Sequence, residues 1–133
     1  MNFSKLAGQI KQRKPERTPC FWSVRFYELG RDEKKNPAFH TAKCKAVDPG
    51  GMEMTSIIPL TPKRFVLVDL DLKTLETVIP SKNLLIISGK YVLTEVEWRH
   101  LNLETSLFEA GLKFIEASRA EEFEPVLTQF IPA

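Results

Sequence analysis

The stretch that decides the fold is Phe-His-Thr-Ala-Lys-Cys-Lys-Ala-Val (39–47), Asp-Pro-Gly-Gly (48–51) and Met-Glu-Met-Thr-Ser-Ile-Ile-Pro-Leu (52–60). Proline presets its own φ and glycine tolerates positive φ, so residues 48–51 form a strong turn signal. The segments on both sides read as strands. The stretch therefore predicts an antiparallel hairpin, in which residues 39–47 and 52–60 are paired through a tight turn.

Further strands are expected on both sides of this hairpin. Residues 20–29 are rich in aromatic and β-branched side chains, which favour extended structure. Residues 65–71 and 75–79 continue the series, and residues 84–88 form a short strand that 91–93 can extend. The first two-thirds of the chain is therefore predicted to be strand-rich.

The hydrophobic period changes after residue 93. Thr94 and Glu97 have the spacing of a capping box, in which each side chain satisfies the backbone N–H of the other residue. Four large apolar residues then follow at intervals of 7, 4 and 3, the stripe of a helix that packs one face on a sheet; they are Leu101, Phe108, Leu112 and Ile115. We predict helices in the last third, and Asn102 as the cap of a second helix.

Strands linked by hairpins and followed by helices are typical of the α+β class. We expect a mainly antiparallel sheet, or a small open barrel of five to six strands, followed by C-terminal helices. The chain has 133 residues, 43% of them hydrophobic, which fits one domain with one core. Residues 20–133 are expected to form this domain, and residues 1–19 a basic, mobile leader.

Cysteine content and hydropathy indicate a cytoplasmic protein. Two cysteines, Cys20 and Cys44, are too few for a disulfide framework. Residues 1–19 contain no uninterrupted apolar run of the kind found in a secretory signal. The longest apolar runs fall far short of the roughly 20 residues that a membrane-spanning helix needs, so no membrane span is predicted.

Charge is distributed unevenly, although the formal net charge is only +2. Residues 1–64 carry 13 Lys and Arg against six Asp and Glu, whereas residues 65–133 carry six against 11. Such asymmetry points to a polyanionic partner for the basic part. Folding can also bring the halves together and cancel the asymmetry, and the sequence leaves both readings open.

The first two strands suggest what the partner is. Side chains alternate across a strand, so Trp22, Val24 and Phe26 share one face, and Ala42, Cys44 and Ala46 share another. If these faces line the core, the opposite faces combine aromatic rings with cations. Single-stranded nucleic acid is bound by such surfaces, because rings stack on bases and Lys or Arg neutralises phosphates.

We therefore predict a non-catalytic nucleic-acid-binding module, specific for single strands. The expected phosphate contacts come from the leader and from the outward face of the hairpin: Lys11, Arg13, Lys14, Arg17, Arg25, Lys43 and Lys45. The expected stacking rings are Phe21, Tyr27 and Phe39. The competing interpretation is that the C-terminal helices cover these rings and make them part of the core.

A protein-interaction or inhibitor module is the main alternative function. The leader places Phe3, Leu6 and Ile10 at helical spacing among cations. Such a segment can bind a partner protein or an anionic membrane surface. It can also be a disordered end that only aids solubility. Residues 120–133 mix acids with spaced phenylalanines. This tail is expected either to dock on a partner or to pack as a last helical turn on its own domain.

Enzymatic signatures are weak. Asp69 and Asp71 share a strand face, where two carboxylates could bind Mg²⁺ beside Lys73, so a metal-dependent nuclease is a further alternative. His40, Cys44 and Cys20 match no zinc-ligand spacing. No glycine-rich nucleotide-binding pattern is present, so neither a metal nor an organic cofactor is predicted.

Overall fold

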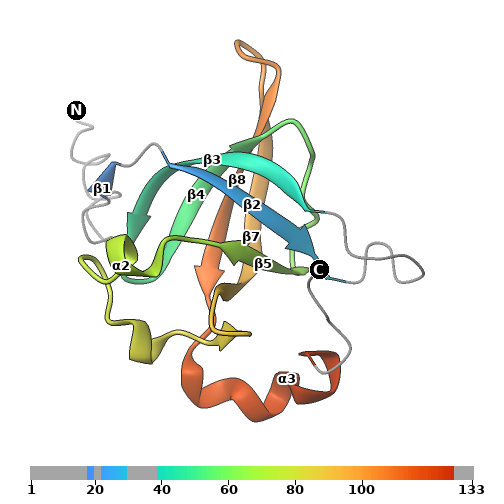
Figure 1. The fold of residues 1–133 in the computed structure, drawn as a ribbon. Coiled ribbons are helices and arrows are strands. Elements are labelled where there is room, and N and C mark those ends of the chain that lie inside the picture. The colour runs from blue at the N-terminus through green and yellow to red at the C-terminus, as the bar shows by residue number, and fades with distance from the viewer. Residues whose placement is uncertain (1–17, 20–21, 30–38, 128–133) are drawn as a thin grey trace, which may run out of the picture.

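The structure is a computed structural model, and it describes residues 18–19, 22–29 and 39–127. Six antiparallel strands close into a barrel (Figure 1). The barrel strands, in chain order, are β2 (Ser23–Glu28), β3 (His40–Asp48), β4 (Gly51–Ser56), β5 (Phe65–Asp69), β7 (Tyr91–Asn102) and β8 (Leu107–Phe114). In space their order is β3-β2-β5-β7-β8-β4, and the pairing of β4 with β3 closes the ring. A small, mainly antiparallel barrel is therefore confirmed, but it is closed and not open as expected.

Short elements complete the fold. Strand β1 (Thr18–Pro19) pairs with β3, and β6 (Ile86–Ile87) pairs with β7. The helices are few: α2 (Leu72–Leu75), α3 (Ala120–Leu127) and the 3-10 turns η1 (Ser81–Asn83) and η2 (Ala117–Arg119). No described helix has both the length and the apolar character needed to cross a bilayer.

The first core fills the barrel. One row across three neighbouring strands consists of Phe26, Val68 and Val92, which are directly opposite one another and fully buried. Their alternation with outward residues is the period of two that an antiparallel sheet requires. The predicted inward faces are confirmed for Val24, Phe26, Ala42 and Cys44, while Trp22 packs half-buried against the same cluster.

The turn between β3 and β4 is built as the sequence predicts. The Asp48 carboxylate accepts hydrogen bonds from the backbone N–H groups of Gly50 and Gly51 at 2.7 and 2.9 Å. Position 51 requires glycine, because a Cβ there would lie 2.0 Å from the carbonyl oxygen of Leu112. The turn thus brings β4 close enough to pair with β8.

A second apolar cluster lies outside the barrel, on the outer faces of β2, β5 and β7. Tyr27, Leu67 and Leu93 contribute from these strands, and Leu85, Ile115 and Phe123 cover them. Helix α3 crosses below this side of the barrel in Figure 1 and supplies Phe123, which is buried. The domain therefore has a barrel core and an apolar layer between barrel and helix.

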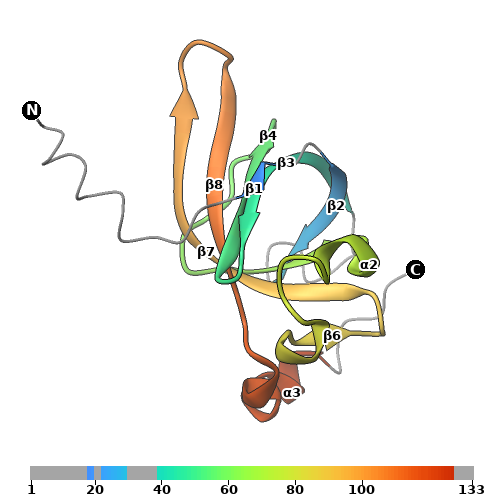
Figure 2. The ribbon, with the colours of Figure 1, turned by 90° about the vertical axis from the view of Figure 1, so that its left-hand side faces the viewer.

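The predicted C-terminal helices are wrong for residues 94–114. This segment is a long hairpin, β7 and β8, whose far end extends beyond the barrel (Figure 2). Ala110, Leu112 and Phe114 point inward with a period of two, and Leu101 lies opposite Phe108 in the extension. The intervals imitated a helix because the predicted stripe left out Ala110 and Phe114, which complete the period of two on β8.

Three smaller expectations also need correction. The strand expected at 75–79 is absent: α2 ends at Leu75 and residues 76–79 form turns. The Asp71 carboxylate caps α2 by accepting from the backbone N–H of Lys73. Within 84–88 only β6 is extended. Helix α3 forms where the regular pattern was expected to end, which confirms packing of the last described turns on the domain. The leader helix lies outside the described residues.

Candidate nucleic-acid interface

The predicted stacking rings lie in the second apolar cluster. Tyr27 is only 9% exposed, and its ring lies 6.1 Å from that of Phe39. The half-buried ring of Phe39 stacks on Tyr91, with 5.4 Å between centroids and an interplanar angle of 18°. The expectation that Tyr27 faces solvent is wrong, because β6 and α3 cover this side of the barrel. Phe21 lies outside the described residues.

Arg25 is engaged within the protein. Its guanidinium group is 2.7 Å from the carboxylate of Asp69 and lies 5.0 Å above the ring of Phe39. Lys90 approaches the same carboxylate at 3.5 Å. The hydrogen bond and charge of Asp69 raise the pKa of Arg25 further above its ordinary value. Arg25 therefore packs at the edge of the aromatic cluster and pairs with Asp69. Both contacts compete with the binding of a phosphate by this side chain.

The acidic pair of the nuclease alternative is also used structurally. Asp69 binds Arg25 and Lys90, whereas Asp71 accepts from the hydroxyl of Thr74 at 2.8 Å and caps α2. These hydrogen bonds lower the pKa of Asp71, with the Thr74 bond as the largest cause. Within the described part of the chain, no three His, Cys, Asp or Glu side chains gather closely enough to hold a metal ion.

The remaining predicted cations are placed differently. Lys43 and Lys45 are exposed on the outer face of β3, as predicted. Lys43 has no hydrogen-bond or ion-pair partner among the described residues, and Lys45 lies 3.3 Å from a carboxylate oxygen of Glu109. The leader residues Lys11, Arg13, Lys14 and Arg17 lie outside the described residues.

We call the outer face of β3, β4, β8 and residues 98–102 of β7 the open face. The apolar layer lies on β2, β5 and the earlier part of β7. One row of directly opposed residues crosses it: Lys43, Thr55, Glu109 and His100. The next row contains Glu53, Gly111 and Trp98. Lysines thus occupy one margin of the open face and aromatic rings occupy the other. Between them lie Thr55 and Gly111 together with the carboxylates of Glu53 and Glu109.

Trp98 and His100 form the aromatic margin. Their rings are stacked, with 5.6 Å between centroids and an interplanar angle of 12°. The indole lies flat over Gly111, where an added Cβ would be 2.2 Å from Nε1. Trp98 remains 36% exposed and His100 is exposed, so both rings are accessible from solvent. The helix expected over these residues hid this pair from sequence reasoning, although the alternation of Trp98 and His100 was visible.

Glu109 joins the two margins of the open face. Its carboxylate contacts Lys45 from β3 at 3.3 Å, His100 from β7 at 3.1 Å and the amide of Asn102 at 3.1 Å. The Asn102 hydrogen bond, followed by Lys45 and His100, lowers the pKa of Glu109. Because Glu109 is already surrounded by these donors, its negative charge is largely compensated within the face.

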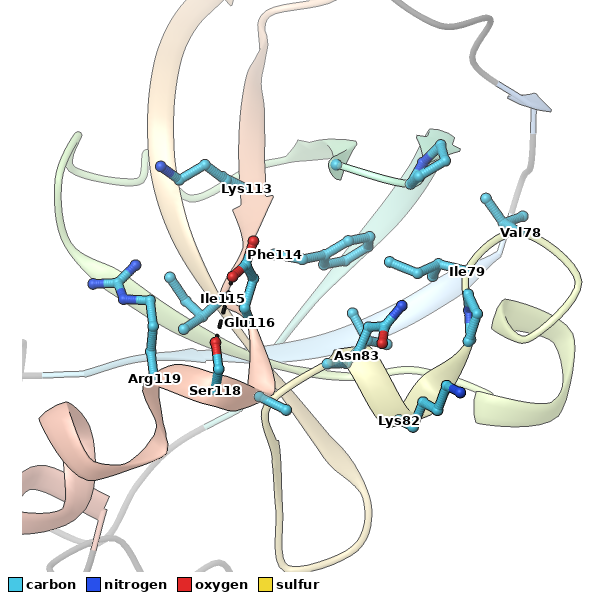
Figure 3. Close-up of a pocket in the computed structure, with 15 residues that line it drawn as sticks. Val78, Ile79, Lys82, Asn83, Lys113, Phe114, Ile115, Glu116, Ser118 and Arg119 are labelled. Atoms are coloured by element: carbon cyan, nitrogen blue, oxygen red, sulfur yellow. Dashed lines mark hydrogen bonds between the residues drawn. The ribbon is translucent and has the colours of Figure 1, made fainter.

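An open cleft lies at the end of the barrel below this face (Figure 3). Its volume is about 950 Å³, within the range of ligand-binding clefts. The ring of Phe114 and the side chain of Ile79 extend toward its centre, and Lys82, Lys113 and Arg119 stand around it. Lys113 comes from β8, so its side chain borders both the cleft and the open face.

Arg119, one of the cations around the cleft, is held by the carboxylate of Glu122. Arg119 makes hydrogen bonds to both carboxylate oxygens of Glu122, at 2.9 to 3.2 Å, and this contact raises the pKa of Arg119. Glu116, which also lines the cleft, accepts a long hydrogen bond of 3.5 Å from Ser118. The cleft therefore has an apolar floor and a mixed charged rim, with Lys82 and Lys113 as its more available cations.

Comparison with known proteins adds no relative to this description: no family model, no curated protein and no solved structure matches the chain. The functional argument consequently depends on the open face and the cleft themselves.

Proposed function

We propose that this protein is a non-catalytic module that binds single-stranded nucleic acid on the open face. The observation that carries the proposal is the exposed stack of Trp98 and His100, which shares one sheet face with the exposed Lys43 and Lys45. The stacking role predicted for Tyr27 and Phe39 passes to this pair. The phosphate-binding role of the two lysines is retained from the sequence prediction.

The dimensions of the open face suit an extended strand. Neighbouring strands are about 4.8 Å apart, so the three spacings from β7 to β3 amount to roughly 14 Å. A base stacked on Trp98 leaves the nucleic-acid backbone to run toward the lysines across Thr55 and Gly111. This path passes the carboxylates of Glu53 and Glu109, of which Glu109 is already engaged by Lys45, His100 and Asn102. Aromatic stacking accepts every base, and lysine contacts to phosphate carry no sequence information. Binding should be sequence-tolerant and strongly salt-dependent.

The basic leader adds to this proposal. Thr18 pairs with Val47 on β3, so the chain that bears Arg17 and the preceding basic residues joins the barrel beside the lysine-bearing strand. Lys11, Arg13, Lys14 and Arg17 would supply further phosphate contacts, each of which steepens the salt dependence. Lys113, near the end of β8, adds a further cation between the open face and the cleft.

The test is a titration of the full chain with a fluorescein-labelled oligothymidylate, read by anisotropy over a range of salt concentrations. Lys43→Gln together with Lys45→Gln should reduce the slope of log K against log salt by about 0.7 to 1.4. Each phosphate contact to a single strand contributes about 0.7, and Lys45 has to leave Glu109 to make one. Lys73→Gln is the matched control, because Lys73 is exposed on α2 and lies outside the open face. It should leave the titration unchanged.

The stacking contribution is tested at Trp98. Trp98→Leu removes the ring but keeps an apolar side chain, and should cost about 1–3 kcal/mol of binding, the usual value for one stacked base. Trp98→Phe keeps a ring and should retain most of the affinity. Absence of binding at low salt, or equal losses in the Leu and Phe variants, would refute the proposal.

A protein-interaction module remains the second candidate, and a specific observation favours it. Beyond the barrel, the β7–β8 hairpin displays Leu101 at 44% and Leu103 at 84% exposure, and Ile57 at the end of β4 is 77% exposed. Large apolar side chains gathered at one end of a domain are typical of contact surfaces between proteins. Co-purification with a protein after nuclease treatment, lost in Leu103→Ser, is the expected result.

A further inference from the structure

The upper part of β7 has an open edge. Strand β5 pairs with β7 only from Tyr91 to Glu95, and the backbone bonds of Lys63 and Arg64 to Val96 are the last on that side. Among the described strands, none pairs with this edge from 98 to 102. Figure 2 shows β7 on the outer side of the protruding hairpin, with β8 between it and the rest of the barrel.

This edge has little of the usual protection against pairing. Natural edge strands are commonly interrupted by proline, marked by charged residues (lysine above all), twisted by a β-bulge or covered by another element. Residues 98–102 read Trp-Arg-His-Leu-Asn, with Arg99 as their one Lys or Arg and no proline. The β-bulge between Val96 and Trp98 lies at the base of the exposed segment, so five consecutive residues remain in extended conformation beyond it.

The tip of the hairpin is held rigidly. The Asn102 side chain accepts from the backbone N–H groups of Glu104 and Thr105 at 2.9 and 3.3 Å, and the backbone N–H of Ser106 donates to the carbonyl of Asn102 at 2.8 Å. Ser106 adopts a φ of 64°, the left-handed conformation that closes the loop. A partner strand would therefore meet an edge that is already ordered, which reduces the entropy lost on association.

We propose that the occupant of this edge is a second copy of the same chain, paired antiparallel about a two-fold axis at His100. In this register Trp98 is opposite Asn102 of the second copy, and Arg99 is opposite Leu101. The register centred on residue 99 would instead oppose two arginines, and like charges directly opposite are destabilising. The register centred on 101 would align fewer of the five residues.

Charge also favours this pairing. Antiparallel alignment brings the tip of one hairpin to the base of the other, where Lys63 and Arg64 lie beside Val96. In this register Glu104, exposed at the tip, is opposite Val96 of the second copy, so it lies near Lys63 and Arg64 of that copy. The exposed Glu97 of the second copy is also near, but the two cations outnumber it. The half-exposed Leu101 is covered by the stem of the opposite Arg99, a common use of long charged side chains.

The dimer is a separate proposal from the nucleic-acid function, but it would enlarge the binding surface that this function uses. A two-fold axis perpendicular to the sheet keeps both open faces on the same side. The order β8-β7-β7-β8 then forms one continuous sheet, on which the two stacks of Trp98 and His100 are neighbours. Dimerisation itself requires no nucleic acid, so it can be tested separately.

The experiment is sedimentation velocity on the full chain without nucleic acid, from low micromolar to near-millimolar concentration. Leu101→Lys places like charges opposite Arg99 twice per dimer, whereas Leu101→Glu places opposite charges there. Both variants lose the same exposed leucine, so they share any cost in folding. We expect both the wild type and Leu101→Glu to dimerise. The dissociation constant of each dimer should be at least about tenfold below that of the Leu101→Lys dimer.

Two outcomes would overturn the proposal: a wild-type chain that remains monomeric at the highest concentration, and equal dissociation constants for the two charged variants. Crosslinking gives an independent reading of the register. His100→Cys should form an intermolecular disulfide on oxidation, because the two copies of residue 100 are opposite each other. Thr105→Cys at the tip should not, and crosslinking at 105 alone would contradict the register. Oligonucleotide binding by Leu101→Lys shows whether the nucleic-acid function survives independently.

Discussion

Replacing Gly111 with alanine should displace the Trp98 ring and destabilise the barrel. The new Cβ would lie 2.2 Å from Nε1 and 2.4 Å from Cε2 of Trp98, distances that no non-bonded carbon atom tolerates. Trp98 is 36% exposed, so it covers about 160 Å² of the roughly 250 Å² that a large aromatic side chain can bury. At about 25 cal/mol per Å² this area corresponds to about 4 kcal/mol.

Only part of that free energy depends on Gly111. The displaced indole can keep contact with His100, so we expect the free energy of unfolding to fall by about 2 kcal/mol. The assay is urea unfolding followed by circular dichroism, with tryptophan emission as a second signal that shifts to longer wavelength when Trp98 moves into solvent.

The control is the same substitution in a Trp98→Ala background. There the obstacle is absent, and Gly111→Ala should be neutral or stabilising by up to about 1 kcal/mol, because alanine restricts the unfolded chain. The sign of the effect should therefore reverse between the two backgrounds. An equal loss of stability in both would refute the reasoning, since it would mean that the backbone at residue 111 does not tolerate any side chain.

Other predictions concern the turn, the open face and the aromatic layer. Asp48→Ala leaves two turn N–H groups without their acceptor and should lower the free energy of unfolding by about 1–3 kcal/mol in urea, whereas Asp48→Asn should lower it less. The pKa of Glu109 is lower in the folded protein than its ordinary value near 4.3, so its stabilising contribution is complete above that value and is lost as pH falls through the folded pKa. Glu109→Gln should therefore be less stable than wild type at neutral pH and lose less stability between pH 5 and pH 3 in the same assay, and parallel curves would contradict this. Arg25→Gln removes an exposed ion pair with Asp69 and should cost at most about 1 kcal/mol, with oligonucleotide affinity unchanged; a clear loss of affinity would return Arg25 to the binding surface.

The first half of the barrel was predictable because its signals are local. The Asp48 carboxylate and the two glycines define a turn whatever surrounds them, and the alternation in β2 and β3 identifies the inward residues Phe26 and Cys44. Both signals depend on a few neighbouring residues. The predicted strand 39–47 accordingly lies within one residue of β3 at both ends, whereas the predicted strand 52–60 runs four residues beyond the end of β4 at Ser56.

The second half was not predictable by the same means. The bulge between Val96 and Trp98 shifts the pairing register of β7 and interrupts its period of two, which weakened the strand signal there. The intervals that also fit a helix join residues of two different strands, since Leu101 lies on β7 whereas Phe108 and Leu112 lie on β8. Gly111 within the segment was the signal that favoured a strand. A glycine in mid-strand marks a close approach, here that of the Trp98 indole.

The sequence of a strand does not show whether its outer face is covered by another part of the chain. Alternation places Tyr27 on the face opposite Phe26, and this is correct. What covers that face is decided by Leu85, Ile115 and Phe123, which lie about 60 to 95 residues further along the chain. The same limit explains why the stack of Trp98 and His100 was missed, since its position beside Lys43 and Lys45 arises only when the barrel closes.

The place of β8 in the ring has a consequence for biosynthesis. It is the last barrel strand in the chain, yet it is inserted between β7 and β4, which precede it. Until Phe114 has left the ribosome, the nascent sheet has two unpaired margins and cannot become a cylinder. During that interval both margins are available for erroneous pairing with other chains, so protection by a chaperone would matter most in the moments before the eighth strand arrives.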